Sequence, residues 1–271
     1  MKVLITNDDG IRAKGLIALA EAASGLGDVV VVAPEAQQSG VGHSITLHKV
    51  LRCDQTSEFP VPGIRAYTTN GTPTDAVLLG IHAVFKVKPD VVISGINGGP
   101  NLGDDVTYSG TIAGAMEGVI AEVPSIAVSM GDFESEYYSE CGEFIAKLAR
   151  MVVESEMPSK LLLNVNYPNL PKDKIKGIVV TKQGHRWYDD VVHEREDPRG
   201  KKYYWITGKK VQKGYDPGTD AYELDQGMIS ITPLTMNLTN MSMIERVAGA
   251  IREFMLGKRD DEESITVKTA D

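Results

Sequence analysis

The chain has 271 residues, which is enough for one large α/β domain or for a domain with an appended segment. Its hydrophobic content of 42% is ordinary for a globular protein, and its net charge of −9 argues against binding of duplex nucleic acid. The opening MKVLITNDDG does not have the basic and apolar regions of a signal peptide, and no apolar run approaches the ~20 residues of a membrane span. Only Cys53 and Cys141 are present, without a CxxC pair, so neither a disulfide framework nor a thiolate metal site is expected. We therefore expect a soluble cytoplasmic protein with no membrane partner.

Predicted strands and helices alternate through the first two thirds of the chain. The run at 29–33 is continuously apolar, which is typical of a strand buried on both faces of a parallel sheet. The predicted strands are residues 2–6, 29–33, 45–53, 63–68, 90–94, 125–130 and 161–166, with 45–53 and 63–68 as a candidate hairpin. The predicted helices are residues 13–24, a helix that begins at Thr72-Pro73, residues 111–122 and residues 142–154. This alternation predicts an α/β fold with a doubly wound, mostly parallel sheet.

The pattern changes after Pro168, where aromatic and polar residues alternate with glycines. We expect two or three antiparallel strands there, then a strand at 227–232 and a helix at 242–255. A hairpin in this region would expose more aromatic surface than a monomer normally tolerates, through Trp187, Tyr188, Tyr203, Tyr204 and Trp205. The preferred interpretation is a subunit contact, and a substrate-stacking arm is the alternative. The predicted division is a catalytic core at 1–166, an oligomerisation extension at 167–258 and a charged, disordered tail at 259–271.

Two adjacent carboxylates, Asp8 and Asp9, follow the first predicted strand directly. Ligand sites in open α/β sheets gather at the carboxyl ends of the strands. Adjacent carboxylates repel each other there unless a cation lies beside them, and oxygen ligands of this kind suit magnesium, manganese or calcium. The alternative is a plain Asp-Asp-Gly turn at Asp8–Gly10, in which these residues only shape the backbone.

Two further loops are expected at the same edge of the sheet. Ser39 lies in the loop after the second strand, and Asn97 follows the strand at 90–94. Together with Asp8 and Asp9 they form a set of oxygen donors that would leave part of a magnesium shell to water and substrate. Taken singly, Ser39 is also explained as a loop cap and Asn97 as a left-handed turn residue.

A fourth element, Ser109-Gly110-Thr111, leads into the predicted helix at 111–122. Free backbone N–H groups and the helix dipole make such a helix start a site for anions, and both hydroxyls add donors for phosphate oxygens. Ser109 or Thr111 as a simple N-cap is the alternative, and the two roles are compatible. The small residues Gly110 and Gly114 would let the helix approach the sheet closely.

These residues together suit phosphoryl transfer. A metal held by Asp8 and Asp9 would polarise the phosphoryl oxygen, while Asn97, Ser109 and the helix start would bind the equatorial oxygens. The aspartate less committed to the metal is the candidate base, and the sequence leaves open which one it is. His43 is a candidate acid for the leaving group, although a structural histidine is the preferred interpretation.

Six segments in the same order resemble the SurE survival-protein family. They are TNDDG at 6–10, PxxxQSG at 34–40, NGTPTD at 70–75, SGIN-G-N at 94–101, YSGT at 108–111 and TDAYELDQGMISITPL at 219–234. The resemblance implies a phosphatase that requires a divalent metal and acts on nucleoside 5′- and 3′-monophosphates, with Asp8, Asp9, Ser39 and Asn97 as metal ligands. It also implies a Rossmann-like core and a homodimer or homotetramer with an exchanged C-terminal element.

Two other classes fit the sequence less well. A phosphatase of the haloacid dehalogenase type requires Asp-x-Asp, whereas Gly10 lies two residues after Asp8 and Asn7 two residues before Asp9. A non-enzymatic dinucleotide-binding module would carry GxGxxG, but the third glycine position after Gly40 and Gly42 is Ile45. The phosphatase therefore stays the preferred prediction.

Overall fold

The structure is a computed structural model that describes residues 1–185, 187–211 and 215–256. It divides into two compact units, Met1–Leu234 and Thr235–Asp271. Within the described residues, no helix is long and apolar enough to cross a membrane.

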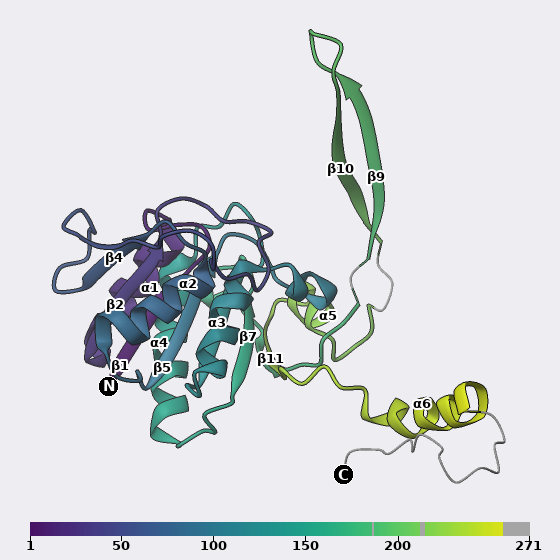
Figure 1. Ribbon diagram of the computed structural model, residues 1–271. Helices are drawn as coiled ribbons and strands as arrows, with labels where there is room; N and C mark the ends of the chain where they lie inside the picture. The colour runs from purple at the N-terminus through teal and green to yellow at the C-terminus, as the bar shows by residue number, and fades with distance from the viewer. Residues whose placement is uncertain (186, 212–214, 257–271) are drawn as a thin grey trace. The chain divides into compact units, whose positions relative to one another are not determined.

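A mixed sheet forms the centre of the first unit (Figure 1). Its strand order is β3-β4-β2-β1-β5-β6-β7-β11-β8. The strands are β1 (Lys2–Thr6), β2 (Asp28–Pro34), β3 (Cys53–Thr56), β4 (Arg65–Thr69), β5 (Val91–Asn97), β6 (Ser125–Met130), β7 (Leu162–Tyr167), β8 (Gly177–Val180) and β11 (Met228–Leu234).

The six strands β4-β2-β1-β5-β6-β7 pair in parallel throughout. Numbered by their order in the chain they run 3-2-1-4-5-6, which is the strand order of Rossmann-like sheets. The predicted doubly wound, mostly parallel fold is confirmed. The order reverses between β1 and β5, where Thr6 lies opposite Ser94, and ligands of such folds bind at this reversal.

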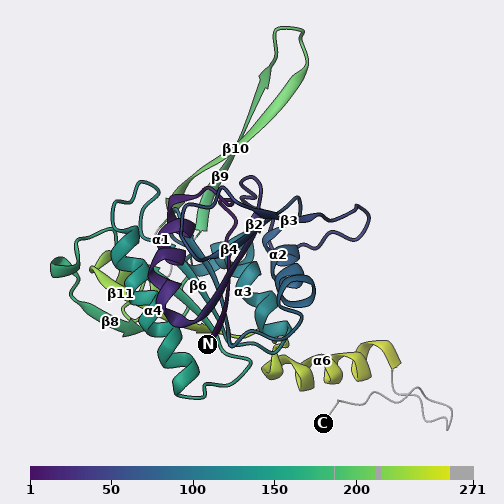
Figure 2. The ribbon, with the colours of Figure 1, turned by 90° about the vertical axis from the view of Figure 1, so that its left-hand side faces the viewer.

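Helices cover both faces of the sheet (Figures 1 and 2). α1 (Lys14–Ala23) and α4 (Tyr138–Glu154) pack together on one face, and α2 (Pro73–Leu79) and α3 (Gly110–Ile120) pack together on the other. Because side chains of a strand alternate between faces, successive residues of β1 enter different cores. Val3 and Ile5 join the cluster with α1 and α4, while Leu4 joins the cluster with α2.

The expected strand at 45–53 is wrong. A strand begins only at Cys53, and β3 then pairs antiparallel with β4, so the predicted hairpin is present but later in the chain. The preceding segment hydrogen-bonds to the start of α2 instead of to a strand, because the Thr46 backbone N–H and hydroxyl donate to Asp75 at 3.0 and 2.7 Å. Its apolar side chains, including Leu47 and Val50, are exposed.

The start of α2 follows the prediction from Thr72-Pro73. The Thr72 hydroxyl accepts the backbone N–H of Asp75, and the Asp75 carboxylate accepts the backbone N–H of Thr72. This reciprocal cap satisfies two helix-terminal donors and fixes where the helix begins.

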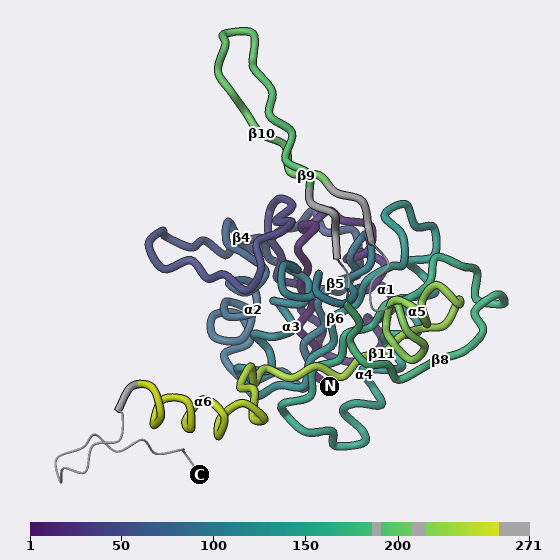
Figure 3. Tube along the Cα trace, turned by 90° about the vertical axis from the view of Figure 1, so that its right-hand side faces the viewer, coloured from purple at the N-terminus to yellow at the C-terminus, as the bar shows by residue number. Residues whose placement is uncertain are grey.

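After Pro168 the chain returns to the sheet before it forms a hairpin of its own. β8 pairs parallel with β11, and β11 pairs antiparallel with β7. β11 confirms the strand expected at 227–232. A short helix, α5 (Asp220–Asp225), precedes it. β8 and β11 lie side by side near α5 (Figure 3). The division of roles between 1–166 and 167–258 stays a prediction.

The predicted aromatic hairpin consists of β9 (Trp187–Glu196) and β10 (Lys202–Val211), which pair antiparallel. Tyr203, Tyr204 and Trp205 are exposed, whereas the side chains of Trp187 and Tyr188 lie outside the described part of the chain. The use of this hairpin in assembly stays a prediction.

The second unit contains α6 (Ile244–Ile251), which continues as a wider helical turn at Arg252–Leu256. It corresponds to the helix expected at 242–255. The predicted tail at 259–271 lies outside the described residues.

Candidate active site

The candidate site lies at the reversal of strand order between β1 and β5. Asp8 and Asp9 follow β1, and Asn97 is the last residue of the neighbouring β5. Asn97 is predicted to lie in a loop, but the strand runs three residues beyond the predicted end at Ser94. The backbone N–H of Gly98 donates to Asp9 Oδ2 at 3.1 Å, so the two strand ends are joined directly.

The segment 7–10 forms a turn and also carries the two adjacent carboxylates of Asp8 and Asp9. The side chain of Asn7 donates to the carbonyl of Gly10 at 3.0 Å and accepts its N–H at 3.2 Å. Gly10 has a φ of 95°, a left-handed conformation that favours glycine. Because Asn7 and Gly10 close the turn between themselves, the carboxylates of Asp8 and Asp9 are not needed for it.

Asp8 is held against the start of α3. Thr111 Oγ1 donates to Asp8 Oδ1 at 2.5 Å, and Asp8 is only 6% exposed. A Cβ on Gly110 would lie 2.8 Å from the Asp8 Cβ and 2.9 Å from Oδ2, so only glycine permits this approach. The sequence predicts that Thr111 binds phosphate but gives no sign of its contact with Asp8, because nothing in the local spacing links residues so far apart. The role of Thr111 in phosphate binding stays a prediction.

Asp9 is half-buried and faces the loop after β2. Gln37 Nε2 lies 3.5 Å from Asp9 Oδ1 and donates to Ser39 Oγ at 2.8 Å. The predicted metal ligands Asp9 and Ser39 are therefore linked through one amide. Gln37 is not among the predicted site residues, and its only signal in the sequence is a polar side chain two residues before Ser39.

Asn97 and Ser109 complete the predicted set. Asn97 Nδ2 donates to the carbonyl of Gly99 at 2.7 Å, which fixes the plane of the amide. Ser109 is the N-cap of α3, and its Oγ accepts the backbone N–H of Ile112 at 3.2 Å. Because this contact uses only a lone pair of Ser109, the hydroxyl hydrogen is still available for an anion at the helix start.

Burial dominates the electrostatics of the two carboxylates. It raises the pKa of Asp8 to about 6, against the lowering effect of the Thr111 hydrogen bond, and the charge of Asp9 adds to the rise. Burial also raises the pKa of Asp9, partly offset by the Gly98 N–H. Two charged groups that are costly to ionise together are stabilised by a cation placed between them.

The donor chemistry fits a hard divalent cation. In the part of the chain that the structure describes, no three His, Cys, Asp or Glu side chains gather as a metal cluster. The candidate site instead offers the two carboxylates of Asp8 and Asp9, and the predicted ligands Ser39 and Asn97 carry neutral oxygens. Two carboxylates with neutral oxygens are the ligands that magnesium and manganese accept.

His43 contacts a helix side chain. Its Nε2 lies 3.0 Å from Oε2 of Glu117, which is nearly buried on α3. Glu117 comes eight residues after Ser109, roughly 12 Å along the helix axis. This contact favours the structural interpretation of His43, which ties the loop after β2 to α3.

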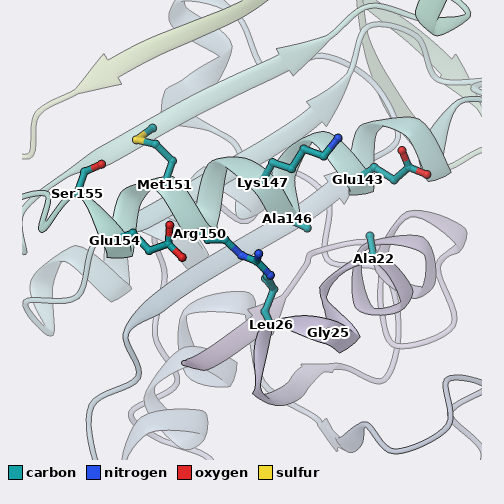
Figure 4. Close-up of a pocket in the computed structure, with 10 residues that line it drawn as sticks. All are labelled: Ala22, Gly25, Leu26, Glu143, Ala146, Lys147, Arg150, Met151, Glu154 and Ser155. Atoms are coloured by element: carbon teal, nitrogen blue, oxygen red, sulfur yellow. The ribbon is translucent and has the colours of Figure 1, made fainter.

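A separate hollow lies between α4 and the end of α1 (Figure 4). Its charged side chains are Glu143, Lys147, Arg150 and Glu154, all from α4. α1 ends there before β2 begins, so the hollow lies toward the amino edge of the sheet. None of the predicted site residues lines it.

Fold and site define an α/β protein of Rossmann-like topology with an acidic, oxygen-rich site at the strand reversal. The model of the family described as "Survival protein SurE" matches residues 3–190. The chain is 46% identical over 245 residues to "5′-nucleotidase SurE" of Geobacter metallireducens, covering 90% of this chain and 95% of that protein. It is 47% identical over 247 residues to the protein of the same name from Syntrophotalea carbinolica, with the same coverage of 90% and 95%.

A solved structure shows the same architecture. The crystal structure of the SurE protein from Aquifex aeolicus aligns with a TM-score of 0.80 and 41% identity, covering 92% of this chain and 99% of that one. The chain therefore belongs to the SurE family, and the predicted family resemblance is confirmed.

Proposed function

We propose that the chain is a phosphomonoesterase that hydrolyses nucleoside 5′- and 3′-monophosphates to nucleoside and phosphate. The observation that carries this proposal is the pair Asp8 and Asp9 at the strand reversal, with the start of α3 packed against it. The two relatives, which align with this chain over 95% of their length, are both named 5′-nucleotidase SurE. Two carboxylates beside the N-terminus of a helix suit a reaction that needs a bound cation and an anion-binding site next to each other.

The proposed cofactor is one divalent cation per subunit, magnesium or manganese. Asp8, Asp9, Ser39 and Asn97 would hold it. When bound, such an ion withdraws charge from the phosphoryl group and makes a water molecule more acidic.

The side chains and backbone N–H groups of the chain bind and orient the phosphoryl group. Ser109 donates its hydroxyl hydrogen to a phosphoryl oxygen, and the first N–H groups of α3, from Gly110 and Thr111, face the same group. The side-chain amide of Asn97 orients a further oxygen. Because the transition state of phosphoryl transfer spreads negative charge over these oxygens, fixed donors stabilise it more than the ground state. Thr111 and Gly98 act on the aspartates, through hydrogen bonds that fix the carboxylates of Asp8 and Asp9.

The protein is further proposed to work in the cytoplasm as a homodimer or homotetramer. The support is the aromatic hairpin β9–β10, whose exposed side chains gain most by burial against another subunit. The net charge of −9 supports a small-molecule substrate over duplex nucleic acid.

A substrate panel tests the proposal. The protein is stripped with a chelator and incubated with nucleoside 5′- and 3′-monophosphates, with magnesium, manganese or no metal added back, and inorganic phosphate is measured. We expect release only with metal. Release that is equal in chelator contradicts the metal site, and no release under any condition contradicts the phosphatase.

A further inference from the structure

An exposed aromatic ring lies directly on the glycines that follow β5. A Cβ on Gly99 would meet the ring of Phe133 at 2.5 Å, so the ring rests on the Gly99 backbone. Phe133 is nevertheless 73% exposed. The ring atoms Cδ1, Cε1 and Cζ therefore lie against the backbone, while most of the side chain remains open to solvent.

A hollow of about 530 Å³ opens beside this ring. Its lining includes the aromatic residues Phe133, Tyr137 and Tyr138, and also the charged residues Lys14, Glu134 and Glu136. The volume lies within the roughly 300–1,000 Å³ of small-molecule sites, which are commonly lined by aromatic residues with a few polar groups.

The hollow adjoins the candidate active site. A Cβ on Gly98 would lie 3.2 Å from the Tyr138 hydroxyl and 4.0 Å from Asp9 Oδ2, so Tyr138 and Asp9 flank the same glycine. Consistent with this, burial and then the charge of Asp9 raise the pKa of Tyr138. Gly99, whose backbone the Phe133 ring contacts, is the next residue, about 3.8 Å further along the backbone.

The segment that follows Phe133 is held by hydrogen bonds to Asn169, which lies in the loop after β7. Asn169 Oδ1 accepts the hydroxyl of Ser135 at 2.9 Å, and Asn169 Nδ2 donates to the carbonyl of Glu134 at 3.1 Å. The Ser135 oxygen in turn accepts the backbone N–H of Tyr137 at 3.2 Å. These contacts order the backbone that follows Phe133 without a ligand, which lowers the entropy lost when a ligand binds beside this segment.

We propose that this hollow is the nucleoside subsite of the active site, and that the exposed face of Phe133 stacks on the base. The inference rests on the proposed nucleotidase function and adds the residue that recognises the nucleoside. Every base presents a π-face, so a stacking platform accepts purines and pyrimidines alike. Phe133 therefore gives affinity for nucleotides over phosphate esters without a base, and little selectivity among the bases.

The test compares a substrate with a base and one without. kcat/KM is measured for adenosine 5′-monophosphate and for ribose 5-phosphate with wild type, Phe133→Ala, Phe133→Leu and Phe133→Trp. Stacking of one base is worth about 5- to 100-fold, so Phe133→Ala should lose that much with the nucleotide and be nearly unchanged with ribose 5-phosphate. Phe133→Leu keeps apolar bulk without a π-face and should resemble Ala, whereas Phe133→Trp should restore the nucleotide activity.

Inhibition of ribose 5-phosphate hydrolysis by adenosine gives a second readout, because the nucleoside occupies the subsite without a phosphate. Its inhibition constant should rise in Phe133→Ala by the same factor. Ile120→Ala removes an exposed side chain at the far end of α3 and serves as the matched control.

Equal losses on both substrates, or no loss on either, would overturn the subsite while the nucleotidase stands. A wild-type protein that releases phosphate from neither substrate would overturn the nucleotidase itself, and the subsite with it.

Discussion

Thr111 donates its hydroxyl hydrogen to Asp8 across 103 positions of the sequence, with an oxygen–oxygen distance of 2.5 Å. The contact joins the first turn of α3 to the end of β1. It therefore fixes the most buried carboxylate of the candidate site relative to the helix start that faces the same place. Together with the close approach of Gly110 to Asp8, this hydrogen bond positions the carboxylate relative to the proposed phosphate-binding helix start.

Removing this hydroxyl should loosen Asp8 without removing a charge. Thr111→Val keeps the shape and loses the donor, so we expect kcat/KM for nucleoside monophosphates to fall about 10-fold, in line with a hydrogen bond to a charged group. Thr111→Ser keeps the hydroxyl and should retain most of the activity. If Thr111→Ser falls as far as Thr111→Val, side-chain packing rather than the hydrogen bond is responsible.

Neutralising either aspartate should abolish the metal-dependent activity. Asp8→Asn or Asp9→Asn removes one of the two charged ligands, and we expect turnover to drop by at least about 10²-fold, comparable with the loss of an active-site electrostatic group. Asp28→Asn makes the same change at an exposed residue that pairs with Arg65, and should leave turnover unchanged. Near-normal activity of both Asp8→Asn and Asp9→Asn in chelator would show that the site is elsewhere.

The raised pKa of Asp8 makes a prediction for the metal-free protein. Its folded-state pKa of about 6 exceeds the unfolded value of 3.8, so the folded state binds more protons between these pH values. Stability should then fall as pH rises from about 4 to above 6, by roughly 1–3 kcal/mol. Asp8→Asn removes this penalty, so in chelator the variant should be more stable than wild type at pH 7.5, but not at pH 4.

Urea unfolding at the two pH values in chelator measures the difference. Added magnesium should stabilise wild type at pH 7.5 and have little effect on Asp8→Asn. A destabilised Asp8→Asn variant at pH 7.5 would show that the Thr111 hydrogen bond outweighs the burial of the charge.

Ser109 offers a test of the phosphate cradle. Ser109→Ala removes the donor aimed at the phosphoryl group, and we expect a loss of about 10²-fold in turnover. Because Ser109 also caps α3, the variant should lose about 1 kcal/mol of stability as well. Ser109→Thr keeps both roles and should recover activity, and a structure with vanadate should place the anion beside Ser109 and Asn97. An anion bound elsewhere contradicts the assignment.

The sequence predicts features of the site that are set by neighbouring residues better than contacts between residues far apart in the chain. The strand before Asp8 and the cap at Thr72 are encoded by neighbouring residues, and both appear where expected. The convergence of Asp9 with the end of β5 followed from the geometry of parallel sheets alone. The contacts of Thr111 with Asp8 and of Gln37 with Asp9 depend on tertiary packing, which no local pattern specifies.

The error at 45–53 has the same origin. Alternating apolar residues there are typical of a strand, but the buried Asp75 of α2 takes up the hydrogen-bonding groups of Thr46. A side-chain acceptor from a distant helix thus outweighed the local preference. The strand that does form, β3, is short and mostly polar, so its bounds had no comparable apolar signal in the sequence, although a hairpin with β4 was expected.

The hairpin β9–β10 should be an assembly element. Within the described residues its two strands pair only with each other, and an isolated two-stranded hairpin is marginally stable in water. Successive side chains of a strand point to opposite faces, yet Tyr204, Trp205 and Ile206 are all exposed. Both faces of the ribbon therefore carry apolar surface that burial against another subunit would stabilise.

Replacing Tyr204 and Trp205 by serine together should therefore shift the protein from dimer or tetramer toward monomer. Sedimentation at micromolar concentration measures the change, and Val87→Ser, at an exposed apolar residue outside the hairpin, serves as the control. The residues proposed for metal and phosphate all precede the hairpin, so the dissociated variant shows whether the site works without it. A wild-type protein that sediments as a fully active monomer would instead make the hairpin a substrate arm.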